Sequence, residues 1–246
     1  MFRRESKVYY RNRRKLSKGP AMSVLRCINA ACLASALALP AVAADIDKVC
    51  AERACRTGGF EAVVGVDAER FIAIPVSHSP YLLEDGSILL FPGETVAVQF
   101  AIDAGNIAKP VAATRYAPHL PALIVKDGGA PQANPDDAGL PPVTAPLPAD
   151  EVALLPPNTV LLSYGQLKPK GESGMALVVE HNLARTLKYS AMIFVVETGG
   201  GYRQGQTSSC PVMPKMWGHE TWPDRLGPIV LGNFHFLADS TVMTCE

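Results

Sequence analysis

Short apolar runs separated by turn residues set the hydrophobic pattern of this chain after residue 45. In the run 95–102, Val96, Val98 and Phe100 occupy alternate positions, which is typical of a strand that buries one face. Turn signals stand at Pro92-Gly93 before this run and at 103–106 after it. The same reasoning predicts further strands at 71–76, 87–91, 122–125, 159–164, 175–181, 189–197 and 229–237. The pattern therefore predicts an all-β fold of antiparallel strands.

The spacing of these runs favours a β-sandwich, with an immunoglobulin-like arrangement preferred and a jelly roll as the second choice. Tyr189 opens an expected strand, and in this it resembles the tyrosine corner of immunoglobulin-like sandwiches. The Cys and Trp that flank this tyrosine in antibody domains are missing here. The one helical pattern, at residues 51–55, is too short to count as an element of the fold.

A proline-rich excursion interrupts the strand pattern between residues 109 and 158, where 11 prolines occur. Proline removes a ladder donor, so this stretch cannot form a central strand, and we expect a long loop with one strand at 122–125. We expect residues 45–246 to form a single domain. The alternative is a linker between two small domains, 45–108 and 159–246. Long loops often carry function, so the excursion is a candidate contact surface.

Residues 1–44 have the layout of an n-region followed by a secretory signal peptide. Basic residues extend to Arg26, an apolar stretch follows, and the small residues at 41–44 predict cleavage after Ala43 or Ala44. Met22 offers an alternative start, which would make residues 1–21 a gene-model extension. A twin-arginine signal is a poorer fit, because 12 residues separate the arginine pair from the apolar stretch. We expect export to the periplasm or outside the cell, with no transmembrane segment in the mature chain.

The charge of the whole chain hides an asymmetry. The formal net charge is zero, but residues 45–246 hold 14 basic and 22 acidic residues, a net charge of −8. This acidic balance argues against nucleic acid as a partner. The expected partner is an unidentified protein or small molecule.

Four cysteines remain after the leader, which is the even number expected of a disulfide-bonded exported protein. We favour the two local pairs, and the alternative joins the N-terminal cysteines to the C-terminal ones. A zinc site is the functional alternative, but a second closely spaced pair is missing. The favoured bridges are Cys50–Cys55 and Cys210–Cys245.

One segment near the C-terminus combines residue types that suit a soft metal. Met213, Met216 and His219 offer thioether and imidazole ligands for copper, and both tryptophans of the chain, Trp217 and Trp222, follow closely. Its glycine and prolines predict an irregular loop held by the Cys210 bridge. We favour packing as the explanation of this segment, in which methionines fill gaps and tryptophans cover a core edge, and copper binding is the alternative. A copper site would be favoured further if His181 and His235 lay near this loop.

Familiar catalytic motifs are missing from the sequence. The stretch 171–174 fails the G-x-S-x-G pattern, 199–201 fails the G-x-G-x-x-G pattern, and His219-Glu220 lacks the second histidine of a zincin. We therefore expect a non-catalytic binding or assembly module without a cofactor. A periplasmic copper-binding protein is the first alternative, and a hydrolase of unrecognised type is the second.

Overall fold

The computed structural model describes residues 43–66, 70–120, 122–126, 129, 132, 138–139, 154–167, 174–197, 201–238 and 244–245. Apart from its last two residues, the expected leader 1–44 lies outside this part, as does most of the proline-rich stretch 127–153. The described residues contain one helix, α1 (Ala43–Glu52). Within them, no helix is long and apolar enough to cross a membrane.

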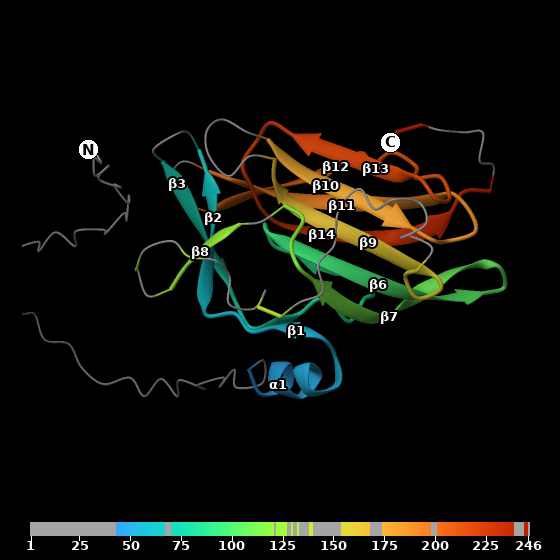
Figure 1. Ribbon diagram of the computed structural model, residues 1–246, viewed down its shortest axis with the longest axis horizontal. Coiled ribbons are helices and arrows are strands. Elements are labelled where there is room, and N and C mark those ends of the chain that lie inside the picture. The colour runs from blue at the N-terminus through green and yellow to red at the C-terminus, as the bar shows by residue number, and fades with distance from the viewer. Residues whose placement is uncertain are drawn as a thin grey trace, which may run out of the picture.

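The protein has an all-β fold of several antiparallel sheets (Figure 1). The five-stranded sheet has the order β13 (Trp217–Trp222), β10 (Met175–His181), β9 (Thr159–Gln166), β6 (Glu94–Asp103) and β7 (Asn106–Tyr116). The four-stranded sheet has the order β12 (Tyr202–Thr207), β11 (Leu187–Val196), β14 (Leu226–Phe236) and β5 (Ile88–Leu90). A three-stranded sheet contains β3 (Phe71–Val76), β2 (Phe60–Gly65) and β8 (Leu123–Val125). A two-stranded sheet pairs β1 (Cys55–Arg56) with β4 (Ser79–Pro80).

The three larger sheets share one hydrophobic core. The expected alternation in β6 is confirmed, because Val96, Val98 and Phe100 are all buried there. Strand β11 alternates in the same way and buries every second side chain from Leu187 to Val195. The core draws residues from both sides of the proline-rich stretch, from Phe60 in β2 to the end of β14. It therefore joins the N-terminal and C-terminal strands around one interior.

Strand β7 occupies residues where the sequence predicted the start of the proline-rich loop. It forms a hairpin with β6 through Ala104 and Gly105, which both have positive φ, the requirement of a type I′ turn. Among the described strands β7 is the last of its sheet, and the ladder register shifts opposite Pro110. An edge strand and a bulge are the two places where a sheet accepts proline. The expectation of a loop from residue 109 onward is therefore wrong for 109–116.

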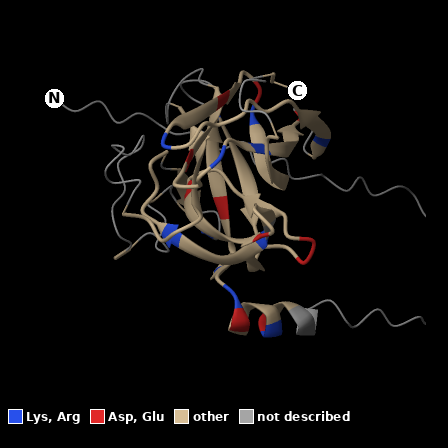
Figure 2. Ribbon diagram, turned by 90° about the vertical axis from the view of Figure 1, so that its right-hand side faces the viewer, with Lys and Arg blue, Asp and Glu red and all other residues tan. Residues whose placement is uncertain are grey.

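Helix α1 is longer than the sequence predicted and stands beside the sheets rather than within them (Figure 2). It contacts β4, and the Cys50–Cys55 disulfide bond joins its last turns to β1. Strands β2, β12 and β13 were also missed by the sequence pattern. Figure 2 shows basic and acidic residues interspersed over the described strands.

Both favoured disulfides are confirmed. Cys50 bonds to Cys55 and Cys210 bonds to Cys245, with separations of 5 and 35 residues. Two disulfides in a chain of this size favour an oxidising, exported environment.

Two buried tyrosines behave differently. The hydroxyl of Tyr164 in β9 donates to the backbone oxygen of Gly227 in β14 at 2.8 Å, which ties the two largest sheets together. Burial raises the pKa of Tyr164 well above its usual value. Within the described part of the chain, the hydroxyl of Tyr189 makes no hydrogen bond. Tyr189 thus lacks the bond that defines a tyrosine corner.

Candidate functional site

The Met–Trp segment, residues 213–219, crosses from one large sheet to the other. Immediately before it, Val212 forms a β-bridge with Leu187 at the start of β11, with hydrogen bonds of 2.8 and 2.9 Å in the two directions. The end of the segment is the beginning of β13, which pairs with β10 in the five-stranded sheet. Both ends of the segment are therefore fixed by backbone hydrogen bonds.

A tight turn opens the segment, with a methionine at each of its ends. The backbone N–H of Met216 donates to the oxygen of Met213 at 3.1 Å, with Pro214 and Lys215 between them. Lys215 has a φ of 60°. Proline followed by a residue with positive φ is the pattern of a type II turn, in which glycine or asparagine normally takes the second place. A lysine there carries backbone strain on the order of 1 kcal/mol. The two methionines stand at the two ends of this turn.

The residues before the turn are anchored from several directions. Cys210 is held by its disulfide to Cys245, and its backbone N–H donates to Oε1 of Glu220 in β13 at 2.7 Å. The side chain of Val212 fills the space above Gly218, where an added Cβ would lie only 2.5 Å from Cγ2 of Val212. The chain on both sides of the exposed residues is thus anchored.

Strand β13 corrects the expectation of an irregular loop. Residues 217–222 form a regular antiparallel ladder with β10, in the register that places Val178 opposite His219. Gly218 and Pro223 do not prevent this, because Gly218 lies where a side chain would collide and Pro223 follows the last strand residue. Within the described residues, β13 is the last strand on its side of the sheet.

The two tryptophans at the ends of β13 have opposite environments. Trp222 is 8% exposed and belongs to the core, and its Nε1 donates to Oγ1 of Thr207 in β12 at 3.1 Å. Trp222 is therefore not available as a contact surface. Trp217 is 51% exposed, and its ring centroid lies 6.0 Å from that of His219, the next residue on the same face of the strand. Of the expected pair, Trp217 alone faces solvent.

Packing does not account for the methionines of the segment. Met213 is 43% exposed and Met216 is 51% exposed, so neither fills a gap in the core. Together with Trp217 they place three large, exposed apolar side chains within five residues. Exposed apolar groups that cluster on a rigid surface mark interaction sites. The packing explanation fits Trp222 and fails for the other three residues.

The two histidines that would have favoured a copper site are engaged in other hydrogen bonds. His181 is fully buried, its Nε2 donates to the backbone oxygen of Val212 at 2.9 Å, and its Nδ1 accepts from the N–H of Leu183. Burial lowers the pKa of His181, with the hydrogen bond to Val212 opposing the shift. His235 contacts the backbone oxygen of Asn233 at 2.7 Å. Among the residues that the structure describes, no three His, Cys, Asp or Glu side chains gather to hold a metal. A metal site here would have to use the thioethers.

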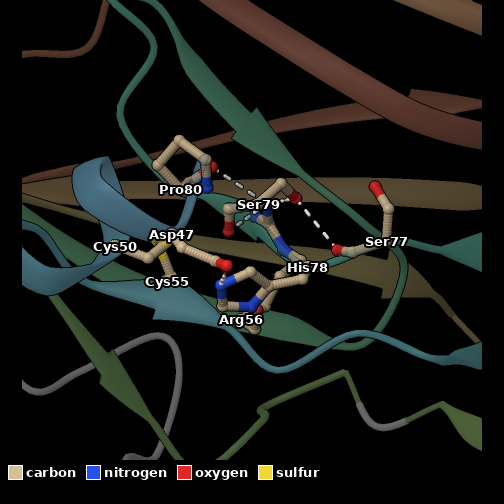
Figure 3. The surroundings of a disulfide bond; sticks show 8 residues. All are labelled: Asp47, Cys50, Cys55, Arg56, Ser77, His78, Ser79 and Pro80. Atoms are coloured by element: carbon tan, nitrogen blue, oxygen red, sulfur yellow. Dashed lines mark hydrogen bonds and ion pairs between the residues drawn. A yellow bond between two sulfur atoms is a disulfide. The ribbon is translucent and has the colours of Figure 1, made fainter. Parts of the chain in front are cut away.

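Arg56, which Figure 3 shows beside the first disulfide, forms a buried ion pair with Glu94 that the sequence did not reveal. Arg56 is 1% exposed, and its Nε and Nη2 donate to the two carboxylate oxygens of Glu94 at 2.8 and 3.1 Å. Nη1 donates to Ser79 Oγ and to the backbone oxygen of Pro80, and Nη2 also donates to the oxygen of Leu89. All five N–H groups of the guanidinium are thereby used.

Aromatic rings complete the surroundings of this arginine. The guanidinium carbon lies 4.3 Å from the ring centroid of Tyr81 and 5.1 Å from that of Phe91. Burial, with the nearby carboxylate of Glu94, raises the pKa of Tyr81 to about 12. A saturated guanidinium has no N–H left for a substrate, so we assign this cluster a structural role: it joins β1 and β4 to the start of β6.

Comparison of the chain with protein-family models, with curated proteins and with solved structures finds no match in any of the three.

Proposed function

We propose that the protein is an exported, non-catalytic binding or assembly module that binds its ligand at the Met–Trp segment and the exposed face of β13. The two disulfides support export to the periplasm or the cell exterior. The common core of the larger sheets supports a single β-sandwich domain as the scaffold.

The strand order supports the immunoglobulin-like form of the sandwich over the jelly roll. Strands β9, β10 and β13 neighbour one another in one sheet as A, B and E do in immunoglobulin domains. Strands β12, β11 and β14 correspond in the same way to C′, C and F. The place of the final G strand beside F is taken by β5, which precedes all of these strands in the chain and pairs antiparallel to β14. The proposed fold is thus an immunoglobulin-like sandwich with a permuted edge strand.

One observation carries the proposed function: Met213, Met216 and Trp217 are exposed by 43 to 51% on a segment whose two ends are fixed by backbone hydrogen bonds. A surface that is both apolar and ordered loses little conformational entropy when a ligand binds, which favours affinity. Copper binding is the second candidate, and it is favoured by the same exposure, because thioethers that do not pack are free to act as ligands.

Site-specific photo-cross-linking in the exporting cell tests the proposed function. Trp217 would be replaced by p-benzoyl-phenylalanine, and the same residue at Leu167, which is 45% exposed outside the segment, serves as the control. We expect a discrete adduct from position 217 and none from position 167. A protein that yields no adduct at 217 and also carries no metal would contradict the proposal.

A further inference from the structure

We propose that an extended segment of a partner polypeptide, neutral or basic in charge, binds by adding a strand to the outer edge of β13. The inference rests on the proposed function, since it names the ligand class of the same surface. In this mode of binding, main-chain hydrogen bonds give affinity and the side chains along the edge give specificity. The exposed side chains of Met213, Met216 and Trp217 stand at one end of this edge.

The ladder between β9 and β10 determines the direction of the backbone groups in β10. At one end of β10, the N–H of Asn182 donates to the oxygen of Thr159 in β9 at 3.1 Å. At the other end, the oxygen of Gly174 accepts from the N–H of Leu167, just after β9, at 3.1 Å. The even-numbered residues of β10 thus direct their N–H and C=O groups toward β9. Because these groups alternate in direction along a strand, the odd-numbered residues of β10 direct theirs toward β13.

Three residues of β13 direct their backbone groups away from the sheet. The odd-numbered residues of β10 lie opposite the even-numbered residues of β13, so these bond to β10. Trp217, His219 and Thr221 therefore turn their N–H and C=O groups to the outer edge. Among the described residues, no backbone hydrogen bond joins this edge to another segment. The side chains of the same three residues are exposed, so the edge offers both backbone groups and side chains to a partner.

The other edge strands carry features that block strand addition. Natural edges use proline, charged side chains, bulges or short length for this purpose. Among the described strands, β7 and β3 contain Pro110 and Pro75, β5 and β8 have only three residues each, and β12 carries Arg203. Strand β13 has six residues, pairs with β10 without a register shift, and contains no proline, lysine or arginine. Its one acidic side chain, Glu220, already accepts a backbone N–H at 2.7 Å.

The charge of the chain distinguishes a second copy from a different partner. Residues 45–246 carry a net charge of −8, so two copies joined edge to edge would repel each other. An acidic peptide is disfavoured for the same reason. The occupant that fits the edge is therefore a neutral or basic extended segment of another polypeptide.

The side chains along the edge set the preferred sequence of this segment. Directly opposed residues of neighbouring strands have Cβ atoms about 5 Å apart, so every second residue of the added strand contacts Trp217, His219 or Thr221. An aromatic or β-branched residue is favoured opposite Trp217. Met213 and Met216 lie before the strand and add exposed, adaptable apolar surface at the same end. We therefore expect apolar residues to be concentrated at one end of the bound segment.

The experiment selects peptides from a random library displayed on phage, with the full mature protein as the target. One selected peptide is synthesised, and its dissociation constant is measured by fluorescence anisotropy. His219→Pro removes an outward N–H that β10 does not use, and an edge strand accepts proline in this orientation. The affinity of this variant should fall at least about tenfold, because a ladder bond is lost and the proline ring occupies its place. His219→Val is the matched control, which removes the imidazole, keeps the N–H and should retain most of the affinity.

Amide hydrogen exchange followed by NMR examines the edge without any substitution. In the unbound protein the N–H groups of Trp217, His219 and Thr221 should exchange quickly, and those of the even-numbered residues of β13 should exchange slowly. Bound peptide should slow the exchange of the first set.

Equal affinity of the peptide for the wild type and His219→Pro would overturn strand addition. Failure to select any peptide, or protection of the outward N–H groups in the unbound protein, would do the same. A wild-type dimer that His219→Pro dissociates would replace the peptide by a second copy and so overturn the assigned occupant.

Photo-cross-linking from position 217 in the His219→Pro background separates this inference from the proposed function. Loss of the adduct supports strand addition by the cellular partner. An adduct that persists would leave the proposed binding surface standing and remove strand addition. No adduct in either background, together with no selected peptide and no bound metal, would remove both proposals.

Discussion

Replacing Arg56 by Met is expected to destabilise the protein far more than any surface change. The substitution keeps the length and apolar stem of the side chain and deletes the guanidinium. It leaves the Glu94 carboxylate buried, with one remaining bond from the backbone N–H of Phe91 at 2.8 Å and Arg115 4.0 Å away. The perturbation therefore leaves a buried carboxylate without its bidentate partner and with only the longer pair to Arg115, rather than removing a surface ion pair.

The magnitude follows from the number and burial of the lost contacts. Arg56 is 1% exposed and donates to two carboxylate oxygens, one hydroxyl and two backbone carbonyls. Removing one partner of a buried ion pair costs about 3–5 kcal/mol. For a protein of 150–250 residues each kcal/mol lowers the melting temperature by about 2–4 °C, so the variant should melt roughly 10 °C lower.

The assay is equilibrium unfolding in urea, followed by far-ultraviolet circular dichroism, on the two single variants and the double variant. Glu94→Met should also be costly, because it leaves a buried guanidinium. The double variant Arg56→Met/Glu94→Met should lose less than the sum of the single losses, since it buries neither charge alone. Arg53→Met, at an exposed arginine three residues away, is the control and should change stability by under about 0.5 kcal/mol.

A loss below about 1 kcal/mol for Arg56→Met is the value of a solvent-exposed pair and would refute the reasoning. Strict additivity in the double variant would show that the two side chains do not interact in solution.

Three further results are expected. Burial lowers the pKa of His181 below 6.5, so the unfolded chain binds more protons in acid than the folded chain does. The stabilisation that depends on neutral His181 is therefore complete above pH 6.5 and is lost as the pH falls below it. The melting temperature of the His181→Gln variant should fall less steeply with decreasing pH. Gly58→Ala should destabilise the protein much more than Gly59→Ala in the same urea assay. Both glycines have positive φ, but only at Gly58 would an added Cβ meet backbone, 2.1 Å from the N atom of His78. Equal losses of stability in the two variants would count against this packing. Trp222→Ala should cost about 3 kcal/mol and Trp217→Ala under about 1 kcal/mol, and the reverse order would mean that the wrong tryptophan has been placed in the core.

Strands with alternating or continuous apolar residues could be predicted from the sequence. A strand that buries one face has an apolar residue at every second position. Val96, Val98 and Phe100 are an example. The two local disulfides were also predictable, because cysteines that are close in the sequence pair early. Strand β13 was not predictable. Its sequence is Trp-Gly-His-Glu-Thr-Trp, and it is a strand because β10 offers a partner, which is a tertiary effect.

The candidate site was predicted as a set of residues but not as a surface. Both tryptophans satisfied the same sequence argument, and the alternation along β13 places Trp222 in the core and Trp217 on the outside. The Arg56–Glu94 pair gave no signal at all, because its members are 38 residues apart and charged residues are ordinarily solvated.

The most direct test of the account is photo-cross-linking from position 217 in the cell that produces the protein. With p-benzoyl-phenylalanine at position 217 we expect one discrete adduct, and with the same residue at Leu167 we expect none. No adduct from position 217 together with no bound metal, or equal adducts from both positions, would contradict the assignment of the Met–Trp segment as the binding surface.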